Sequence, residues 1–185
     1  MQQKIRLETE RLVISTTLIH ECLDLQNICD SWFDKMEIEG SIFEPDYIKK
    51  CFSQGDLPPI KNANKSSYRL LSIKRKETQE LIGFSDLYFG YPAADTAWIS
   101  IFMIHTIYRK NGYAQEAINM ISDECKKLGF SKIGIAVYLK NWRALRFWIK
   151  AGFRNVIGIK GDKDYSYDAF ARIELTMNLK QTNLV

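Results

Sequence analysis

The sequence predicts an α/β protein built around one βαβ unit, and three stretches carry this prediction. Residues 97–104 are apolar except for Ser100, as in a strand that is buried on both faces. Residues 114–128 place small and apolar side chains at helical spacing. Residues 132–138 form a further apolar strand. Because a single helix joins the two strands, we expect a parallel pair with a right-handed crossover.

The other expected elements lie before and after this unit. Runs rich in apolar and β-branched residues predict further strands, within 7–15 and at 68–74, 81–89, 154–159 and 170–177. Apolar stripes predict further helices, at 18–28, 47–52 and 142–151. Thr16 or Thr17 can cap the first of these helices, and Asn141 can cap the last, which Gly152 ends.

Length and composition indicate one domain, spanning residues 1–185. The chain has 185 residues, of which 46% are hydrophobic, and a net charge of +4. No internal repeat or linker divides it, and no run reaches the ~18 apolar residues of a membrane span. Residues 1–6 lack the apolar region of a signal peptide. We therefore expect a cytoplasmic protein without a membrane partner.

Cysteine and histidine usage argues against a metal site. The four cysteines show no C-x-x-C spacing, and the two histidines, His20 and His105, do not stand at ligand spacing. We therefore expect no metal, and we interpret the cysteines as reduced core residues.

The turn between strand 97–104 and helix 114–128 indicates an anion site. A glycine turn at a helix N-terminus presents free backbone N–H groups, and here Arg109 and Lys110 add positive charge. A pyrophosphate fits these features. The spacing matches neither the Walker loop nor the Gly-x-Gly-x-x-Gly dinucleotide fingerprint.

Two motifs resemble the signatures of the GNAT N-acetyltransferase superfamily, whose members bind acetyl-coenzyme A. Arg109-x-x-Gly112-x-Ala114 is similar to its Arg/Gln-x-x-Gly-x-Gly/Ala signature. Downstream, residues 141–153 match Asn-x-x-Ala-x-x-x-aromatic-x-x-x-Gly-Phe. The opening Glu-Thr-Glu-Arg-Leu at 8–12 looks like the ribosomal-protein N-terminal acetyltransferase branch, which speaks for the fold and not for the substrate.

The resemblance implies a single N-acetyltransferase domain with a core at about 7–179. Its sheet would be mixed and twisted, with six to seven strands, about four flanking helices and a splayed central parallel pair. Acetyl-coenzyme A would be the co-substrate of this acyltransferase. Carried over by position, its binding residues are Phe102, Met103 and Ile104 for the pantetheine and thioester, Arg109, Lys110, Asn111, Gly112, Tyr113 and Ala114 for the pyrophosphate, and Asn141, which is otherwise a plain N-cap.

The reaction implied is direct attack by a neutral primary amine in a ternary complex, which needs a proton acceptor and a proton donor. The aromatic that often protonates the thiolate is a tyrosine, and here it is Trp148. An indole N–H is too weak an acid, so Trp148 is expected to pack against the cofactor. Tyr138, Tyr113 or water could replace it, or the thiolate could leave unprotonated.

The proton acceptor is left open by the sequence. Strand 97–104 carries no carboxylate. His105 follows its end and has a suitable ordinary pKa of ~6.5, although it can equally be a loop histidine without a catalytic part. The other candidates are Asp86, Glu37 and Glu39.

The acceptor site is expected in segment 30–46, which holds six acids, one lysine and interleaved aromatic residues. In the resembled fold, the loop between the first two helices covers the acceptor. Trp32, Phe33, Glu37 and Glu39 would then form a wall that favours a cationic amine, either a small molecule or a protein N-terminus. The alternative is a solvated helix face and loop.

Two other functions compete with the enzyme. One is a coenzyme A-binding sensor or interaction module with little turnover, which Trp148 and the acid-free strand support. The other is a nucleic-acid binder that uses the basic segment 140–163 and Trp142. A nearby polyanionic cofactor explains those charges more simply, so we do not expect a nucleic-acid partner. The chain is expected to be a monomer or a homodimer.

Overall fold

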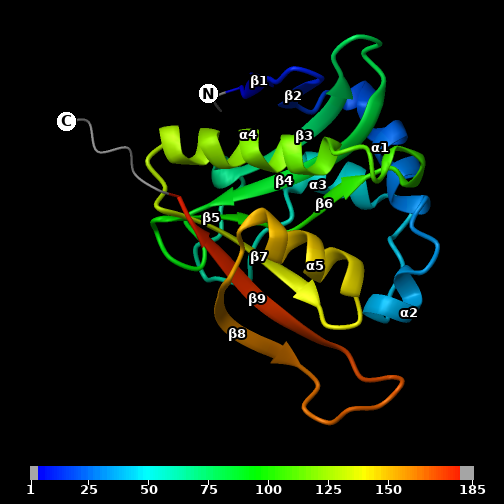
Figure 1. Ribbon diagram of the computed structural model, residues 1–185, viewed down its shortest axis with the longest axis vertical. Helices are drawn as coiled ribbons and strands as arrows, with labels where there is room; N and C mark the ends of the chain where they lie inside the picture. Colours follow the sequence, from blue (N-terminus) through cyan, green and yellow to red (C-terminus); the bar gives the residue numbers. More distant parts are fainter. Residues whose placement is uncertain (1–3, 180–185) are drawn as a thin grey trace.

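The computed structural model describes residues 4–179, and within them nine strands form one twisted mixed sheet (Figure 1). The strands are β1 (Arg6–Glu8), β2 (Leu12–Thr16), β3 (Tyr68–Arg75), β4 (Leu81–Phe89), β5 (Thr96–Ile99), β6 (Phe102–Ile104), β7 (Lys132–Tyr138), β8 (Asn155–Gly161) and β9 (Ala171–Asn178). Their order is β1-β2-β3-β4-β5-β7-β9-β8, and β6 pairs with β4. The mixed α/β fold predicted from the sequence is confirmed.

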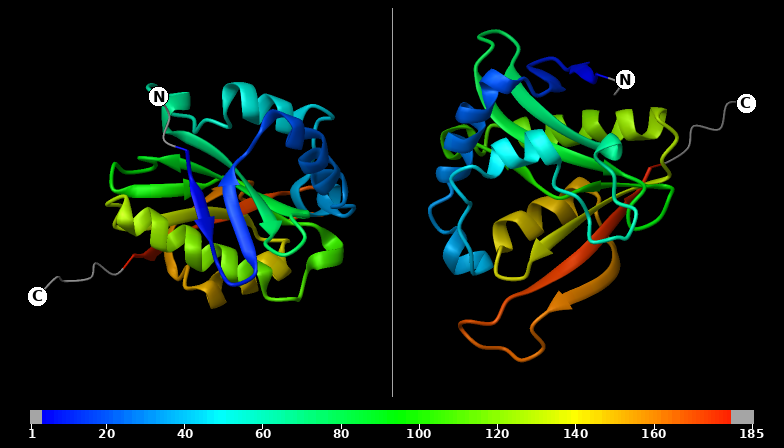
Figure 2. Two further views of the ribbon diagram at one scale, coloured as in Figure 1. Left: turned by 90° about the horizontal axis from the view of Figure 1, so that it is seen from above. Right: turned by 180° about the vertical axis from the view of Figure 1, so that it is seen from behind.

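Helices cover both faces of the sheet (Figure 2). They are α1 (Cys22–Asp30), α2 (Lys35–Glu39), α3 (Tyr47–Gln54), α4 (Tyr113–Lys127) and α5 (Trp142–Ala151). One core lies between the sheet and α4 and α5, where Ile118 and Ile121 are fully buried. A second core lies between the sheet and α1 and α3, around Leu25, Ile48 and Phe84. The two cores explain why the central strands are apolar on both faces.

Several predicted boundaries were wrong. The expected strand 97–104 is divided into β5 and β6, and the charged lead forms β1, so the sheet has more strands than the six to seven expected. The first helix begins at Cys22 rather than after Thr17, because a 3-10 turn at Ile19–Glu21 precedes it. Segment 30–46 contains the short helix α2, as the alternative of a helix face and a loop allowed.

The parallel pair splays where β5 ends. β5 pairs with β7 from Thr96↔Lys132 to Ile99↔Ile135. Beyond this point, β6 pairs with β4 alone, and the last part of β7 pairs with β9 alone. The backbone edges of β6 and the end of β7 therefore face each other across a notch without pairing. The expected splayed pair is present.

No helix among residues 4–179 is long and apolar enough to cross a membrane. The start of the chain, on which the expectation about a signal peptide depends, lies partly outside the described residues.

Candidate active site

A buried carboxyl group creates the break between β5 and β6. Oδ1 of Asp86, on β4, accepts hydrogen bonds from the backbone N–H groups of Ser100 (2.8 Å) and Ile101 (2.9 Å). Asp86 is fully buried, and its Oδ2 has no hydrogen-bond partner among the described residues. Burial and the nearby Asp56 raise the pKa of Asp86 well above its usual value, although the two amide bonds oppose this rise.

The notch opens into a cavity of about 550 Å³. One side is formed by residues 99–103 of the bulged strand pair, and the other by residues 135–138 of β7 and the start of α5. The remaining wall comes from α2, α3 and their connections, between Trp32 and Asp56. Hence Phe102 and Met103 of the predicted pantetheine segment, but not Ile104, line the same cavity as part of the segment predicted to bind the acceptor.

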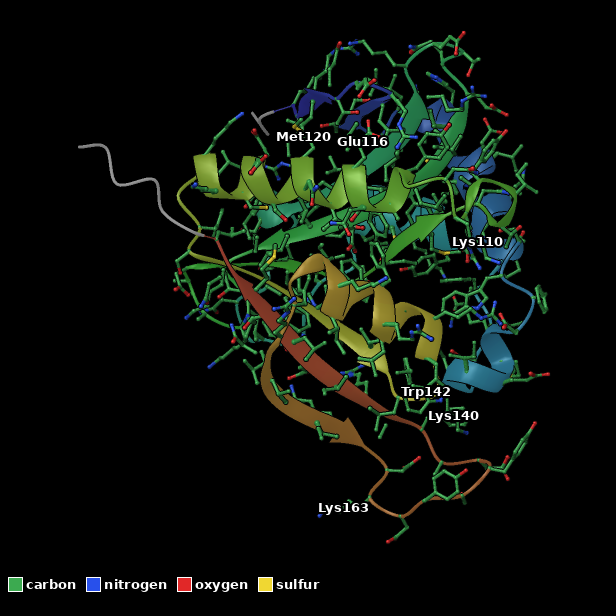
Figure 3. The ribbon with its side chains drawn as sticks, viewed as in Figure 1. Lys110, Glu116, Met120, Lys140, Trp142 and Lys163 are labelled. Atoms are coloured by element: carbon green, nitrogen blue, oxygen red, sulfur yellow. The ribbon has the colours of Figure 1, made fainter. Side chains whose placement is uncertain are left out.

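The predicted pyrophosphate turn lies between β6 and the N-terminus of α4, where Figure 3 labels Lys110. Lys110 and Gly112 have positive φ angles of 67° and 82°, which aim the chain into the first turn of α4. The first N–H groups of a helix have no acceptor within it. The Nε of Arg109 donates to the carbonyl oxygen of Ile104 (3.1 Å), and burial lowers the pKa of Arg109.

Arg11, which the sequence did not suggest, supports this turn. Its Nη1 donates to the carbonyl oxygen of Asn111 (3.0 Å), and its Nη2 forms an ion pair with Glu116 of α4 (2.6 Å). Its guanidinium carbon lies 4.7 Å from the ring centre of Tyr113. The hairpin of β1 and β2 is thereby joined to the start of α4, and Tyr113 packs there rather than lining the cavity.

Asn141 and Trp148 place α5 against the notch. Oδ1 of Asn141 accepts a hydrogen bond from the N–H of Ala144 (3.1 Å), so Asn141 is an N-cap that also borders the cavity. Trp148 is 7% exposed, and its ring lies 5.6 Å from that of Phe102 and 4.9 Å from that of Phe153. Trp148 thus packs against Phe102 of β6 and also lines the cavity.

The three predicted catalytic residues are separated by the fold. Tyr138, half-buried at the end of β7, lines the cavity. Asp86 lies behind the cavity wall that Ser100 and Ile101 form. The structure does not bring His105 to the cavity, because its Nδ1 accepts a hydrogen bond from the N–H of Ile107 (3.3 Å) and caps a 3-10 turn.

The predicted acceptor wall is also divided. Trp32 and Glu39 line the cavity, whereas Glu37 is exposed and Phe33 is 83% exposed, and neither is part of the lining. Helical geometry explains the split for α2, since residues two positions apart point to different sides of a helix.

At this wall, a lysine of the protein lies where a cationic amine was expected to bind. Nζ of Lys35 lies 3.0 Å from the carboxylate of Glu39 and 4.6 Å from the ring centre of Phe43. It also donates to the hydroxyl of Ser41 (3.0 Å). Lys35 is 7% exposed. Lys35 therefore pairs with Glu39 and occupies the position expected for a cationic amine, while the role of Glu39 toward the acceptor stays a prediction.

Two contacts join the ends of α2 to other elements, one to α5 and one to the residue before β9. Asp34, which precedes α2, pairs with Arg143 of α5 (3.1 Å). At the other end of α2, Gly40 has φ 71°, and a Cβ there would lie 2.7 Å from the ring of Phe170. Phe170 precedes β9, and Trp142 and Lys140 lie beside α2 in Figure 3. None of the residues in these contacts is part of the cavity lining.

Asp56 is a cavity residue that the sequence analysis missed. It follows the end of α3, and its Oδ2 accepts a hydrogen bond from the hydroxyl of Tyr47 on α3 (3.3 Å). Burial raises the pKa of Asp56 above its usual value, and the bond from Tyr47 opposes this rise. An acid directly after a glycine at a helix end, in Gly55-Asp56, was the only signal in the sequence.

No group of three or more His, Cys, Asp or Glu residues that could hold a metal ion occurs within residues 4–179.

Comparisons with known proteins agree with this architecture. The profile of the Acetyltransferase (GNAT) family matches residues 28–153. No curated protein matches the chain. Similar solved structures include an acetyltransferase from Thermus thermophilus, with 18% identity, a TM-score of 0.69, and coverage of 95% of this chain and 100% of that chain.

Two other similar structures are of enzymes whose names state the acceptor. Spermidine N-acetyltransferase from Vibrio cholerae, in complex with CoA and spermine, has 15% identity, a TM-score of 0.70, and coverage of 92% of this chain and 97% of that chain. The ribosomal-protein-S18-alanine N-acetyltransferase from Escherichia coli has 15% identity, a TM-score of 0.66, and coverage of 94% and 99%. At such identities these structures show the fold alone. With the family profile across more than half of its length, this chain belongs to the GNAT family of acetyltransferases.

Proposed function

We propose that the protein transfers an acetyl group from acetyl-coenzyme A to a primary amine by direct attack in a ternary complex. One observation carries this proposal: the notch between β6 and β7 and the wall between Trp32 and Asp56 belong to one cavity. A cofactor arm in the notch and an amine under α2 would therefore meet without a shuttle residue.

The residues at the notch fit coenzyme A. The backbone of residues 102–104 pairs with β4 on one side and has a free edge toward β7. The positive-φ turn at 110–112 and the start of α4 offer N–H groups to a pyrophosphate. When bound, acetyl-coenzyme A supplies the activated acetyl thioester. Phe102, Met103 and Ile104 would hold the pantetheine, residues 109–114 the pyrophosphate, and Asn141 and Trp148 the inner wall.

Tyr138 is our candidate for returning a proton to the leaving thiolate. It lines the cavity at the end of β7, across the notch from β6. It is half-buried, so part of the residue is in contact with water. Trp148 has no comparable acid, which leaves Tyr138 as the phenol on the cofactor side of the cavity.

The acceptor we propose is a small primary amine or an extended protein N-terminus. The contacts Asp34–Arg143 and Gly40–Phe170 hold α2 across the acceptor side. Both contacts lie near the cavity, and a concave site of this kind suits a small molecule or an extended chain end.

A coenzyme A-binding module without turnover is the second candidate, and Trp148 at the proton-donor position favours it. One experiment separates the two: release of free coenzyme A measured with polyamines, aminoglycosides, amino acids and short peptides, beside a coenzyme A binding titration. Turnover with one acceptor class supports the enzyme. Tight binding without turnover supports the module. The absence of binding would contradict both.

A further inference from the structure

The charges that line the acceptor side of the cavity are paired, with one exception. Lys35 pairs with Glu39 at 3.0 Å, and Lys50 pairs with Glu44. Asp56 lines the same cavity but has no ion-pair partner among residues 4–179, and its hydrogen bond comes from the neutral hydroxyl of Tyr47. A cationic amine that enters the cavity therefore meets one carboxyl group that no lysine or arginine of the described chain neutralises.

A second, fully buried carboxyl group interacts electrostatically with Asp56. Asp86 on β4 is fully buried, and its Oδ2 is unpartnered among the described residues, as is the hydroxyl oxygen of Tyr68 on β3. Burial and the charge of Asp56 raise the pKa of Asp86, and the hydroxyl of Tyr68 beside it lowers that pKa. Cys51 of α3 completes the group of titratable side chains, and burial raises its pKa to about 12, so it stays a neutral thiol.

Two carboxyl groups in one buried region cannot both ionise at low cost. Asp86 is tied to the bulge through its bonds to Ser100 and Ile101, whereas Asp56 stands on the cavity surface. Backbone hydrogen bonds therefore hold Asp86 in place, and Asp56 is the carboxyl group that an amine in the cavity can reach. Resting on the function proposed above, we propose that Asp56 receives the acceptor ammonium and accepts its proton.

In this arrangement, each proton of the reaction has a donor and an acceptor. The acceptor ammonium, R–NH₃⁺, gives one proton to the Asp56 carboxylate and becomes R–NH₂. The nitrogen lone pair then forms the N–C bond to the acetyl carbon as the C–S bond breaks. The second proton of the nitrogen goes to the sulfur, and Asp56 later releases the first proton to water. The products are the amide, the free thiol and one H⁺.

The other acids named for this role are less suited to it. Glu39 and Glu44 are held in ion pairs by Lys35 and Lys50, so neither offers an unpaired carboxylate to an amine. Glu37 and His105 are not part of the cavity lining. Burial raises the pKa of Asp56 toward the range in which a general base works best.

The first test needs no acceptor. Infrared titration of the whole protein follows the C=O stretch of protonated carboxyl groups in wild type, Asp56→Asn, Asp86→Asn and Asp123→Asn. Asp123 is an exposed acid on α4 and serves as the matched control. We expect a band that persists above the ordinary aspartate range of ~3.9. Asp56→Asn should weaken it and move the remaining titration to lower pH. Spectra of Asp56→Asn equal to those of wild type would overturn the proposal.

The second test measures kcat/KM against pH with the amine of the panel that reacts fastest. We expect Asp56→Asn to lower it by about 10²- to 10⁴-fold and to remove the fall at acidic pH, with coenzyme A affinity unchanged. Asp86→Asn should leave the pH of that fall close to the wild-type value, because burial rather than Asp86 raises the pKa of Asp56. An unchanged profile in Asp56→Asn would overturn the proposal while leaving the acetyltransferase intact. Failure of wild type to bind coenzyme A would instead refute the proposed function.

Discussion

The cofactor side and the acceptor side of the cavity are built in different ways. The cofactor side consists of regular elements, β6, α4, β7 and α5, joined by three short connections (Figure 1). The acceptor side consists of the five-residue helix α2, the eight-residue helix α3 and their connections. The first offers backbone groups at a notch between strands, and the second offers side chains that mostly neutralise each other.

This difference has a physical cause. A pyrophosphate and a pantetheine amide are bound by backbone groups, and backbone geometry depends on strands, glycines and helix ends. An amine is selected by charged and aromatic side chains, and their effect depends on which partner each one finds. Substitutions should therefore act differently on the two sides, and four of them test this.

The largest effect is expected for Trp148→Ala, on the cofactor side. Trp148 is 7% exposed and packs against Phe102 and Phe153, so its truncation should lower the free energy of unfolding by about 3–5 kcal/mol. Denaturant unfolding measures this. Trp142→Ala, at a side chain that is 68% exposed on the same helix, should stay within about 0.5 kcal/mol of wild type. Similar losses in both variants would contradict the packing described.

Next in size is Lys35→Met, on the acceptor side. It leaves the largely buried carboxylate of Glu39 without its 3.0 Å partner, and we expect a loss of about 1–3 kcal/mol in unfolding free energy. It also frees a negative charge in the cavity, so KM for a polyamine such as spermidine should fall. Lys49→Met, at an exposed residue on α3, is the control. An unchanged KM in Lys35→Met would show that Glu39 does not face the acceptor.

A smaller effect on stability is expected for Gly112→Ala. Gly112 has φ 82°, and Gly129, at the other end of α4, has φ 92° with open space around it. An alanine at either position should cost about 1–2 kcal/mol, because both adopt a left-handed backbone. Only Gly112→Ala should weaken coenzyme A binding, by about tenfold or more. Equal affinities in the two variants, measured by titration, would place the pyrophosphate elsewhere.

The smallest effect is expected for Arg143→Ala. Its side chain is 78% exposed in the ion pair with Asp34, and such pairs contribute about 0.2–1 kcal/mol. The loss should disappear at high salt, because salt screens exposed charges. Arg146→Ala, at an exposed residue on the same helix, provides the comparison. A loss of unfolding free energy as large as that of Lys35→Met, and insensitive to salt, would contradict the assignment of this contact as a weak surface ion pair.

The sequence predicted the cofactor side almost completely. The βαβ unit, the turn at 109–114 and the cap at Asn141 lie where the spacing placed them. It missed the division between β5 and β6, because the bulge depends on Asp86, a residue of another strand. His105 was a reasonable candidate by position, but its side chain folds back onto Ile107.

The acceptor side was predicted only as a region. Segment 30–46 does reach the cavity through Trp32 and Glu39, but the pairing of Lys35 with Glu39 and the arrival of Asp56 from the next loop were hidden. Net charge over a segment does not say which charges find partners. Asp56 carries no periodic or motif signal, since its role arises from burial beside Tyr47 and Asp86.

What the sequence alone determined is the family, the order of elements and the backbone sites, since each follows from local spacing within one strand, turn or helix. The tertiary structure alone decided which charges meet. It joined Arg11 to Glu116, Asp34 to Arg143, and Asp86 to the bulge at 100–101, over separations in the chain that no local pattern records. Electrostatic pairing acts through space and burial, so it can be read only once the chain is folded.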